Sequence, residues 1–388
     1  MKSCFIRVSL ALSALLVGLE SSTKAAPFTP GHLVVLRVNG TSSAAQSVDL
    51  VQFNTFTPGQ SGSVIVSLPS SGSGPLLTQS GNNNTQGALT LSADKTHLVL
   101  TGFNAPAGTA NVAGTSSSSV ARVVALVDAS RNVNLTTSLN AYSGQSITAA
   151  ASLTGNPGSG LWTAGTGPGG AGANGIRHTT IGSSGSGTRV VNPGGALQQP
   201  RVVQIVNNQL YFSDNDQLRR TNVPLPTTSD VATSNVTTTG LAQARGFVFF
   251  DHNNNGVLDT LYVADQVLGL VKFSSEDGVT WTWRGVEVGS FTGITGVYTG
   301  GGFELYVTTG NAVTAGNQLR RYVDTAAYNA TINTGGTFVT LATAAPGTIF
   351  RGVNFTPVPE PQPWGLTASC LGLLFSLQLM RCRLPRHS

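Results

Sequence analysis

The sequence is poor in charged residues and has no cysteine in its central part. Asp, Glu, Lys and Arg together make up 10% of the chain, against about 25% in an average globular domain, which argues against a coiled coil or a charge-solvated disordered segment. The three cysteines, Cys4, Cys370 and Cys382, lie in or beside two terminal apolar segments. The long part between them offers no thiol nucleophile and no cysteine-ligated metal. Its size lets a hydrophobic core hold the fold without disulfides.

The positive net charge does not indicate an acidic partner. Six of the 21 basic residues and two of the 16 acidic residues lie at the chain ends, which leaves 15 basic against 14 acidic residues in between. Nucleic-acid binding needs basic residues that cluster on one face. We therefore predict that nucleic acid is not a partner.

The short motifs of common enzyme classes are also missing. The sequence contains no Gly-x-Ser-x-Gly and no Walker loop. Gly-rich stretches such as Gly165 to Gly175 lack the following helix that a dinucleotide-binding fingerprint needs to hold phosphate. No stretch between residues 27 and 357 carries apolar residues at helical spacing over three turns. The histidines of residues 27–357 are scattered and show none of the pairings that ligate zinc. They are His32, His97, His178 and His252.

Residues 1–25 are predicted to be a signal peptide. Lys2 and Arg7 precede an apolar run at 8–19, and residues 23–25 supply small side chains for cleavage. This charged, apolar, small-residue order is that of a secretory signal. The run of 12 residues is too short to span a bilayer as a helix. We therefore expect signal peptidase to remove it rather than the segment to stay as an anchor.

The other end of the sequence combines three features in a fixed order. The motif Val358-Pro359-Glu360-Pro361 precedes an uncharged apolar stretch at 364–380 and then an arginine cluster, Arg381 to Arg386. A stretch of this length just suffices for a membrane-spanning helix, and basic residues behind it would stay in the cytoplasm. The three features together resemble the PEP-CTERM sorting signal of Gram-negative bacteria. The resemblance covers residues 358–388.

This resemblance implies a processing enzyme of the exosortase type as a partner. Such an enzyme recognises the motif, cuts the chain and releases or re-anchors the body at the surface. We therefore expect the protein to be exported, held in the membrane by the 364–380 helix, and then located at the cell surface or outside the cell. The lead-in Gln362-Pro363-Trp364 departs from the Ser/Thr-rich segment usual in the family, which puts the efficiency of cleavage in question.

Between the two ends, residues 27–357 are predicted to form an all-β body. Short apolar, β-branched runs alternate there with Gly, Asn, Ser and Thr. One element recurs, as in Leu210-Tyr211-Phe212-Ser213 and Leu261-Tyr262-Val263-Ala264. A period of about 40–50 residues with several strands per unit is typical of a β-propeller. The leading leucines of the six copies are Leu33, Leu98, Leu161, Leu210, Leu261 and Leu305.

Six copies predict a six-bladed β-propeller with four strands per blade. Seven blades is the alternative count, and an irregular β-sandwich or β-helix is the alternative fold. Longer Gly/Ser/Asn-rich insertions lie near residues 70–84 and 105–119. One strand, Ile349 to Phe355, remains after the last blade, whereas His32 to Val38 begins without a preceding strand. We predict that these two segments pair and close the ring, because pairing removes exposed sheet edges.

The loop from Asp251 to Asp259 is the most specific local pattern. Oxygen-bearing side chains occupy its positions 1, 3, 5 and 9, with glycine at position 6, a spacing by which loops wrap calcium. It resembles the calcium hairpins of integrin-like propellers. With only two carboxylates we expect weak binding, and the alternative is an Asn/Gly-rich hairpin that needs no ion. The predicted calcium ligands are Asp251, Asn253, Asn255, the Val257 carbonyl and Asp259.

Three further features have both a functional and a structural interpretation. Residues 275–281 resemble a degenerate Asp-box, a hairpin signature of sialidase-like propellers that shapes a turn without doing chemistry. The pairs Arg219-Arg220 and Arg320-Arg321 could form a basic lip, but strand alternation favours ordinary strand surface. Aromatic packing between blades is favoured over sugar stacking for the three tryptophans of the body, which are Trp162, Trp281 and Trp283.

Two classes of function fit this body. The first is a non-enzymatic surface or matrix protein whose propeller serves adhesion or contact with extracellular polysaccharide. The alternative is a secreted propeller enzyme, a hydrolase or lyase acting on glycans. An enzyme would gather carboxylates, histidine or a metal from several blades at the central channel. The carboxylates of the body are spread along the sequence and most sit at turns, so we favour the non-catalytic class.

Overall fold

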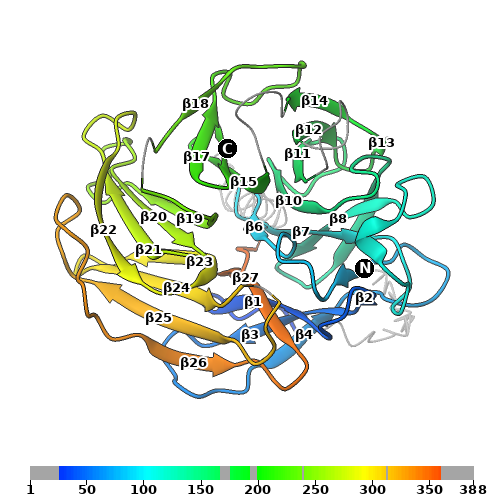
Figure 1. Ribbon diagram of the computed structural model, residues 1–388, viewed down its shortest axis with the longest axis horizontal. Coiled ribbons are helices and arrows are strands. Elements are labelled where there is room, and N and C mark those ends of the chain that lie inside the picture. The colour runs from blue at the N-terminus through cyan, green and yellow to red at the C-terminus, as the bar shows by residue number, and fades with distance from the viewer. Residues whose placement is uncertain (1–25, 167–174, 193–198, 238–239, 312, 360–388) are drawn as a thin grey trace, which may run out of the picture.

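The structure is a six-bladed β-propeller. It is a computed structural model that describes residues 26–166, 175–192, 199–237, 240–311 and 313–359. Six sheets stand around a central axis (Figure 1). The predicted all-β class and the six-blade count are confirmed, and the seven-blade, sandwich and β-helix alternatives are wrong.

In every blade the first strand lies at the central channel and the fourth lies toward the rim (Figure 1). Blade 1 contains β27 (Ile349–Phe355), β1 (Leu33–Val38), β3 (Val48–Phe53) and β4 (Ser63–Ser67). Blade 2 contains β6 (Leu89–Leu91), β7 (His97–Phe103), β8 (Arg122–Asp128) and β9 (Val133–Leu139), to which the short β13 (Ser184–Gly185) adds in parallel. Blade 3 contains β10 (Ile147–Ser152), β11 (Gly160–Gly165), β12 (Gly175–Thr180) and β14 (Thr188–Val191).

The other three blades follow the chain without interruption. Blade 4 contains β15 (Pro200–Val206), β16 (Gln209–Asp214), β17 (Gln217–Thr221) and β18 (Thr233–Asn235). Blade 5 contains β19 (Ala244–Phe250), β20 (Thr260–Asp265), β21 (Gly269–Ser274) and β22 (Thr282–Val288). Blade 6 contains β23 (Phe291–Tyr298), β24 (Phe303–Thr309), β25 (Gln318–Asp324) and β26 (Val339–Thr343).

The element that repeats in the sequence is the second strand of each blade. Its leading leucine lies in β1, β7, β11, β16, β20 and β24 in turn. The ring closes as predicted, because β27 pairs antiparallel with β1. Leu33 lies opposite Phe355 and Val38 lies opposite Ile349. The last strand of the chain thus supplies the innermost strand of the first blade.

Six clusters of buried apolar side chains fill the spaces between neighbouring blades. Successive residues of one strand enter different clusters. Val34 lies between blades 1 and 2, whereas Leu33 and Val35 lie between blades 6 and 1. Because both faces of these strands are buried, they form continuous apolar runs in the sequence. This explains why the second strands were recognisable as a repeat.

The two predicted insertions pack against each other. β2 (Ala45–Gln46) pairs with β5 (Gln79–Ser80) from the first insertion. The 3-10 helix η1 (Val112–Gly114) of the second insertion contacts β5. These short elements stand outside the six blades and add a wall beside the channel.

The predicted signal helix at 1–25 and the predicted membrane helix at 364–380 lie outside the described residues. In the described part of the chain, no helix is long and apolar enough to cross a membrane.

Candidate functional site

The predicted calcium loop connects β19 and β20 in blade 5. The Asp251 carboxylate accepts hydrogen bonds from the main-chain N–H groups of Asn255 and Gly256, at 3.1 and 2.7 Å. The amide oxygen of Asn253 accepts from Asn255 N–H at 3.1 Å, and that of Asn255 accepts from Val257 N–H at 2.7 Å. The side-chain oxygens of this loop thus satisfy its own backbone, as Asn and Asp do in turns.

The last predicted calcium ligand, Asp259, has a different partner. Its carboxylate lies 2.6 Å from Nδ1 of His252 and accepts the His252 main-chain N–H at 3.1 Å. The structure therefore gathers Asp251, Asn253 and Asn255 in one turn and directs Asp259 to His252. Within the described residues, no group of three or more His, Cys, Asp or Glu side chains could hold a metal ion. Weak calcium binding by this loop stays a prediction.

The predicted sorting motif begins directly after the ring is closed. The main-chain N–H of Val358 donates to the carbonyl of Lys95 at 2.9 Å, and the Val358 side chain is half-exposed. Pro359 follows it, whereas Glu360 and Pro361 lie outside the described residues.

Two of the three tryptophans pack as the structural interpretation expects. Trp162 is buried and donates from Nε1 to the Pro226 carbonyl at 2.7 Å. Trp281 packs its ring edge-to-face on Phe249, with centroids 5.4 Å apart. Trp283 is half-exposed on the outer strand β22.

The two arginine pairs form ion pairs within their own blades. Arg219 lies 3.2 Å from Asp214, and Arg321 lies 3.0 Å from Glu304. Both contacts join neighbouring strands of a single sheet. One arginine of each pair thus forms an ion pair within its sheet, and Arg219 is buried. A structural role within the sheet therefore fits these pairs better than a basic lip.

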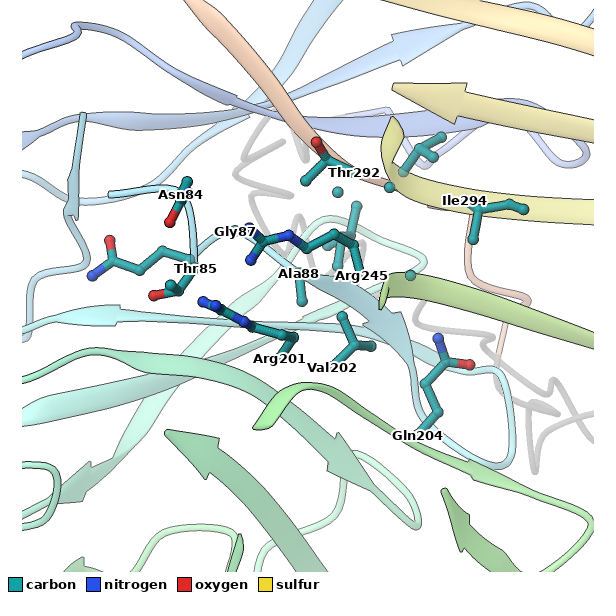
Figure 2. Close-up of a pocket in the computed structure, with 16 residues that line it drawn as sticks. Asn84, Thr85, Gly87, Ala88, Arg201, Val202, Gln204, Arg245, Thr292 and Ile294 are labelled. Carbon is teal, nitrogen blue, oxygen red and sulfur yellow. The ribbon is translucent and has the colours of Figure 1, made fainter. Parts of the chain in front are cut away.

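The central channel contains a small cavity, the channel cavity, of about 30 Å³. Residues of β6, β15, β19, β23 and β27 line it, together with the segment 84–88. Two charged side chains reach it, Arg201 of β15 and Arg245 of β19. Figure 2 shows both guanidinium groups extending from their strands toward Asn84 and Thr85. The cavity is therefore a cationic pocket at the end of the channel where these strands begin.

Arg201 and Arg245 are almost fully buried, with 7% and 3% of their surfaces exposed. Nη2 of Arg201 donates to the side-chain oxygen of Gln199. Arg245 donates from Nε to the side-chain oxygen of Gln266 at 2.8 Å and from Nη2 to that of Gln243 at 3.4 Å. The Nη1 atom of each arginine has no hydrogen-bond partner among the described residues. A buried donor without a partner costs free energy unless a ligand or water satisfies it.

Both arginines are positioned by the same local arrangement. Each follows a glutamine by two residues, as Gln199-Pro200-Arg201 and Gln243-Ala244-Arg245. The main-chain N–H of each glutamine donates at 2.8 Å to the aspartate that ends the neighbouring second strand, Asp214 or Asp265. The aspartate fixes the glutamine, and the glutamine side chain then accepts from the arginine. Blades 4 and 5 thus present one motif twice, side by side.

Burial changes the electrostatics of this pair. It lowers the pKa of Arg201 to about 10, although the negative charge of Asp214 opposes the shift. The pKa of Arg245 falls to about 9, because burial and then the positive charge of Arg201 lower it, while Asp265 opposes them. Both guanidinium groups are still protonated at neutral pH. Their mutual repulsion and desolvation would be relieved by an anion between them.

A third buried arginine, Arg351 of β27, builds the wall of the site. It donates from Nη1 to the side-chain oxygen of Gln79 at 3.1 Å and from Nη2 to the carbonyls of Ser80 and Gly81, at 2.7 and 3.2 Å. Gly87 has a φ of 94°, and a Cβ there would come within 2.3 Å of the Arg351 side chain. Glycine at position 87 therefore lets the segment 79–87 cross over Arg351.

A larger cavity of about 510 Å³, the polar cavity, adjoins the channel cavity and shares Asn84 and Thr85 with it. The two insertions supply most of its wall. Ten of its eleven lining residues carry an amide or a hydroxyl group, and the eleventh is Ala113. The ten are Ser43, Ser80, Asn82, Asn83, Asn84, Thr85, Asn111, Gln145, Thr166 and Gln199.

Hydrogen bonds hold this wall in place. Asn83 and Gln86 both donate to the hydroxyl of Ser146, at 2.8 and 2.9 Å. The amide oxygen of Asn83 accepts from Thr85 N–H at 2.9 Å, and that of Gln86 accepts from Ser80 N–H at 3.0 Å. The polar cavity is therefore formed before any ligand arrives, which lowers the entropic cost of binding.

Neither cavity is lined by a carboxylate, a histidine, a tyrosine or a lysine from the described residues. General acid–base catalysis needs such a group within hydrogen-bond reach of the substrate. The arrangement can recognise hydroxyl groups and an anion, and its described lining offers no proton-transfer group.

The sequence contained a signal for this site that our sequence analysis missed. Where the innermost strands β15 and β19 begin, the Gln-x-Arg motif occurs at 199–201 and again at 243–245, 44 residues apart and at the blade period. Its other copies, at 217–219 and 318–320, lie in third strands. The distance from the motif at the innermost strand to the next repeated leucine differs between blades 4 and 5. In blade 5 the Asp251–Asp259 loop lies between the motif and Leu261 and lengthens that distance. Aligning the innermost strands rather than the second strands would have exposed it.

No protein-family model and no curated protein matches the chain. Solved structures resemble it in fold. A chain in the crystal structure of a nidogen/laminin complex aligns with 85% of this chain and 99% of its own length, with a TM-score of 0.51 and 11% identity. The C-terminal domain of Pseudomonas aeruginosa PilY1 covers 75% of this chain and 57% of its own, with a TM-score of 0.27 and 14% identity, too little to carry an argument. The similarity to the chain of the nidogen/laminin complex supports the propeller fold and nothing further.

Proposed function

We propose that this protein is a non-catalytic, polysaccharide-binding β-propeller that is exported and displayed at the cell surface or in the extracellular matrix. The polar cavity is the observation that carries the binding role. Its volume lies in the range of small-molecule sites, about 300–1,000 Å³. Its amide and hydroxyl groups both donate and accept hydrogen bonds, which matches the hydroxyl groups of sugar rings. A preformed wall of amide and hydroxyl groups, whose described residues supply hydrogen bonds rather than proton transfer, supports binding of the glycan over its hydrolysis or lysis.

Export and sorting are proposed from the two ends of the sequence. A signal peptide at 1–25 would direct the chain to secretion, with signal peptidase as the first partner. The motif Val358-Pro359-Glu360-Pro361, the apolar stretch at 364–380 and the arginines behind it would then hold the chain for an exosortase-type enzyme. Val358 follows the last strand of the ring by only a few residues, so cleavage there would leave the propeller whole.

The fold likeness is compatible with a binding role. The nidogen/laminin structure is a complex between proteins, and one of its chains has a fold similar to this one. A propeller of this size can therefore act by contact with another macromolecule. The adhesion partner of this chain is not indicated by that likeness.

The binding role is tested with the purified full chain and a panel of neutral and acidic polysaccharides, using biolayer interferometry. We expect binding to at least one polysaccharide, and a loss of at least about tenfold in affinity when Asn84→Trp fills the polar cavity. Asn84 is half-buried in that wall, whereas Thr228 is exposed between β17 and β18. Thr228→Trp is the matched control and should bind as the wild type does. Equal binding by the two variants would contradict the assignment of the site.

A further inference from the structure

We propose that Arg201 and Arg245 form an oxyanion site that takes the carboxylate of an acidic sugar, such as a uronic acid unit of a polysaccharide. This rests on the proposed polysaccharide binding and names the chemical class of its ligand. The polar cavity would hold the sugar rings, and the channel cavity would receive the charged group.

Two unpartnered donors at one place carry the proposal. The Nη1 atoms of Arg201 and Arg245 lack a hydrogen-bond partner among the described residues, and both side chains are more than nine-tenths buried. Both arginines line the channel cavity, and their guanidinium groups extend the same way (Figure 2). A guanidinium is a planar donor that matches the geometry of a carboxylate. One carboxylate could accept from both Nη1 atoms.

Two other buried arginines, Arg122 and Arg351, direct their donors mainly to main-chain oxygens. Arg122 is fully buried and donates to the carbonyls of Val120, Thr115 and Gln145, at 2.6, 2.8 and 2.7 Å. Arg351 donates in the same way to the segment 79–81. Those two guanidinium groups hold loops through their carbonyl oxygens. Arg201 and Arg245 instead donate only to side-chain amide oxygens in the described structure, and the Nη1 atom of each has no partner there.

The two carboxylates near these arginines, Asp214 and Asp265, already accept hydrogen bonds from other groups of the protein. Asp265 accepts from the main-chain N–H groups of Ala242, Gln243, Val267 and Leu268, all at 2.8 to 2.9 Å. Asp214 accepts from Gln199 N–H and pairs with Arg219. Neither aspartate lines the channel cavity or the polar cavity. An incoming anion therefore meets the guanidinium groups rather than a carboxylate.

The size of the channel cavity selects a small anion. A buried water needs about 10–15 Å³ of such space, so a cavity of about 30 Å³ holds about two oxygen atoms. A carboxylate presents two oxygens, whereas a sulfate or phosphate ester presents three beyond its bridging oxygen. The cavity shares Asn84 and Thr85 with the polar cavity, which would let one sugar unit reach both.

The test compares polygalacturonate with its fully methyl-esterified form, using isothermal titration calorimetry on the purified full chain. We expect the wild type to bind the free acid at least tenfold more tightly than the ester. Arg201→Met and Arg245→Met should each remove that preference. Lys95→Gln is the charge-matched control, because Lys95 is exposed between β6 and β7, away from both cavities. It should keep the preference.

The comparison of polygalacturonate with its methyl ester on the wild-type chain tests the proposal even if an arginine variant does not fold. Equal binding of acid and ester would overturn the carboxylate site. Binding of dextran sulfate in place of polygalacturonate would also overturn it, because the anion would then be a sulfate. Arginine variants that fold and keep the preference for the acid would place the charged group elsewhere.

Failure of the carboxylate site and failure of the proposed polysaccharide binding would give different results. If the chain binds a neutral polysaccharide in a way that Asn84→Trp abolishes, and shows no preference for the acid, polysaccharide binding stands and the carboxylate site fails. If no polysaccharide binds at all, both proposals fail.

Discussion

Four of the six buried arginines in the described part of the chain divide into two kinds by the atoms that they contact. Arg122 and Arg351 donate to main-chain carbonyls and hold segments that cross or flank the channel. Arg201 and Arg245 contact side-chain amides and leave Nη1 unpaired within the described residues. A buried charge is tolerated when its donors are satisfied. The first kind therefore serves the fold, and the second kind is available to a ligand.

Arg351→Met is expected to lower the free energy of unfolding by about 2–4 kcal/mol. The substitution leaves the side-chain oxygen of Gln79 and the carbonyls of Ser80 and Gly81 buried without this donor. Burial lowers the pKa of Arg351 to about 9, so burying its charge costs free energy. Removing that charge therefore offsets part of the stability lost with the hydrogen bonds. Urea denaturation of the purified chain measures the change. Arg220→Met, at a half-buried strand position, should cost less than 1 kcal/mol, and equal losses in the two variants would contradict the anchoring role.

The Asp251–Asp259 loop should bind calcium weakly, and Asp251→Ala should remove that binding. Asp251 already accepts two main-chain hydrogen bonds, so an ion would have to share or replace them, which limits the affinity. Titration calorimetry with calcium chloride measures the heat. Asp277→Ala is the control, because Asp277 accepts comparable bonds from Val279 and Thr280 in the neighbouring hairpin. Calcium heat that survives in Asp251→Ala would rule out this loop as the site.

Among the elements of the fold, β27 has a special place, since it is the last strand of the chain and the first strand of blade 1. It pairs with β1, carries Arg351 and packs Phe350 and Val353 into the cluster between blades 6 and 1. Gly352 lies so close to the segment 87–89 that a Cβ there would come within 2.4 Å of the Leu89 nitrogen. The strand therefore joins the two ends of the ring and supports the channel wall.

Deleting residues 349–355 is expected to destabilise the whole propeller rather than one blade. The deletion exposes the edge of β1 and removes Phe350, Val353 and Phe355 from the apolar cluster between blades 6 and 1. Differential scanning calorimetry should show a single transition at a much lower Tm. A chain that ends at residue 359 serves as the control, because it keeps β27. If the deleted chain unfolded at the temperature of this control, the closure would not be what holds the ring.

Second strands were easier to predict from the sequence than innermost strands. β16, β20 and β24 are apolar on both faces, and the same pattern returns in each blade. Innermost strands such as β6 and β10 are short or rich in Ala and Thr, because the narrow channel admits only small side chains or polar ones. Their pattern therefore carries little periodic signal. The innermost strands that carry Arg201 and Arg245 have yet other sequences, PRVVQIV in β15 and ARGFVFF in β19, so no common pattern marked them.

For the molecule as a whole, the ring and its closure followed from the count of repeats and from the unpaired strand at each end. The candidate site could not be predicted in this way, because it depends on contacts between segments that are far apart in the sequence. The polar cavity joins Asn82 to Thr85 with Asn111, Gln145 and Gln199. Nothing in the spacing of these residues indicates that they meet. The insertions near 70–84 and 105–119 were treated as loops, yet they build the wall.

Sorting by the C-terminal segment should leave a mature protein that ends near the Pro359-Glu360-Pro361 motif. The apolar stretch at 364–380 can just span a bilayer, and the arginines behind it are costly to translocate. Because proline disfavours helix, the prolines on both sides of Glu360 are expected to suit this stretch of sequence to recognition by a protease. Mass spectrometry of surface material should find no peptides from beyond Pro361. Intact peptides from residues 381–388 in mature surface protein, in cells that have the processing enzyme, would overturn this assignment.

The most direct measurement is a crystal structure of the full chain with a galacturonate trisaccharide. We expect sugar rings in the polar cavity, against Asn84 and Thr85. We also expect one carboxylate within about 3.2 Å of Nη1 of both Arg201 and Arg245. A trisaccharide bound on another face, or bound here with its carboxylates turned to solvent, would contradict the proposed site.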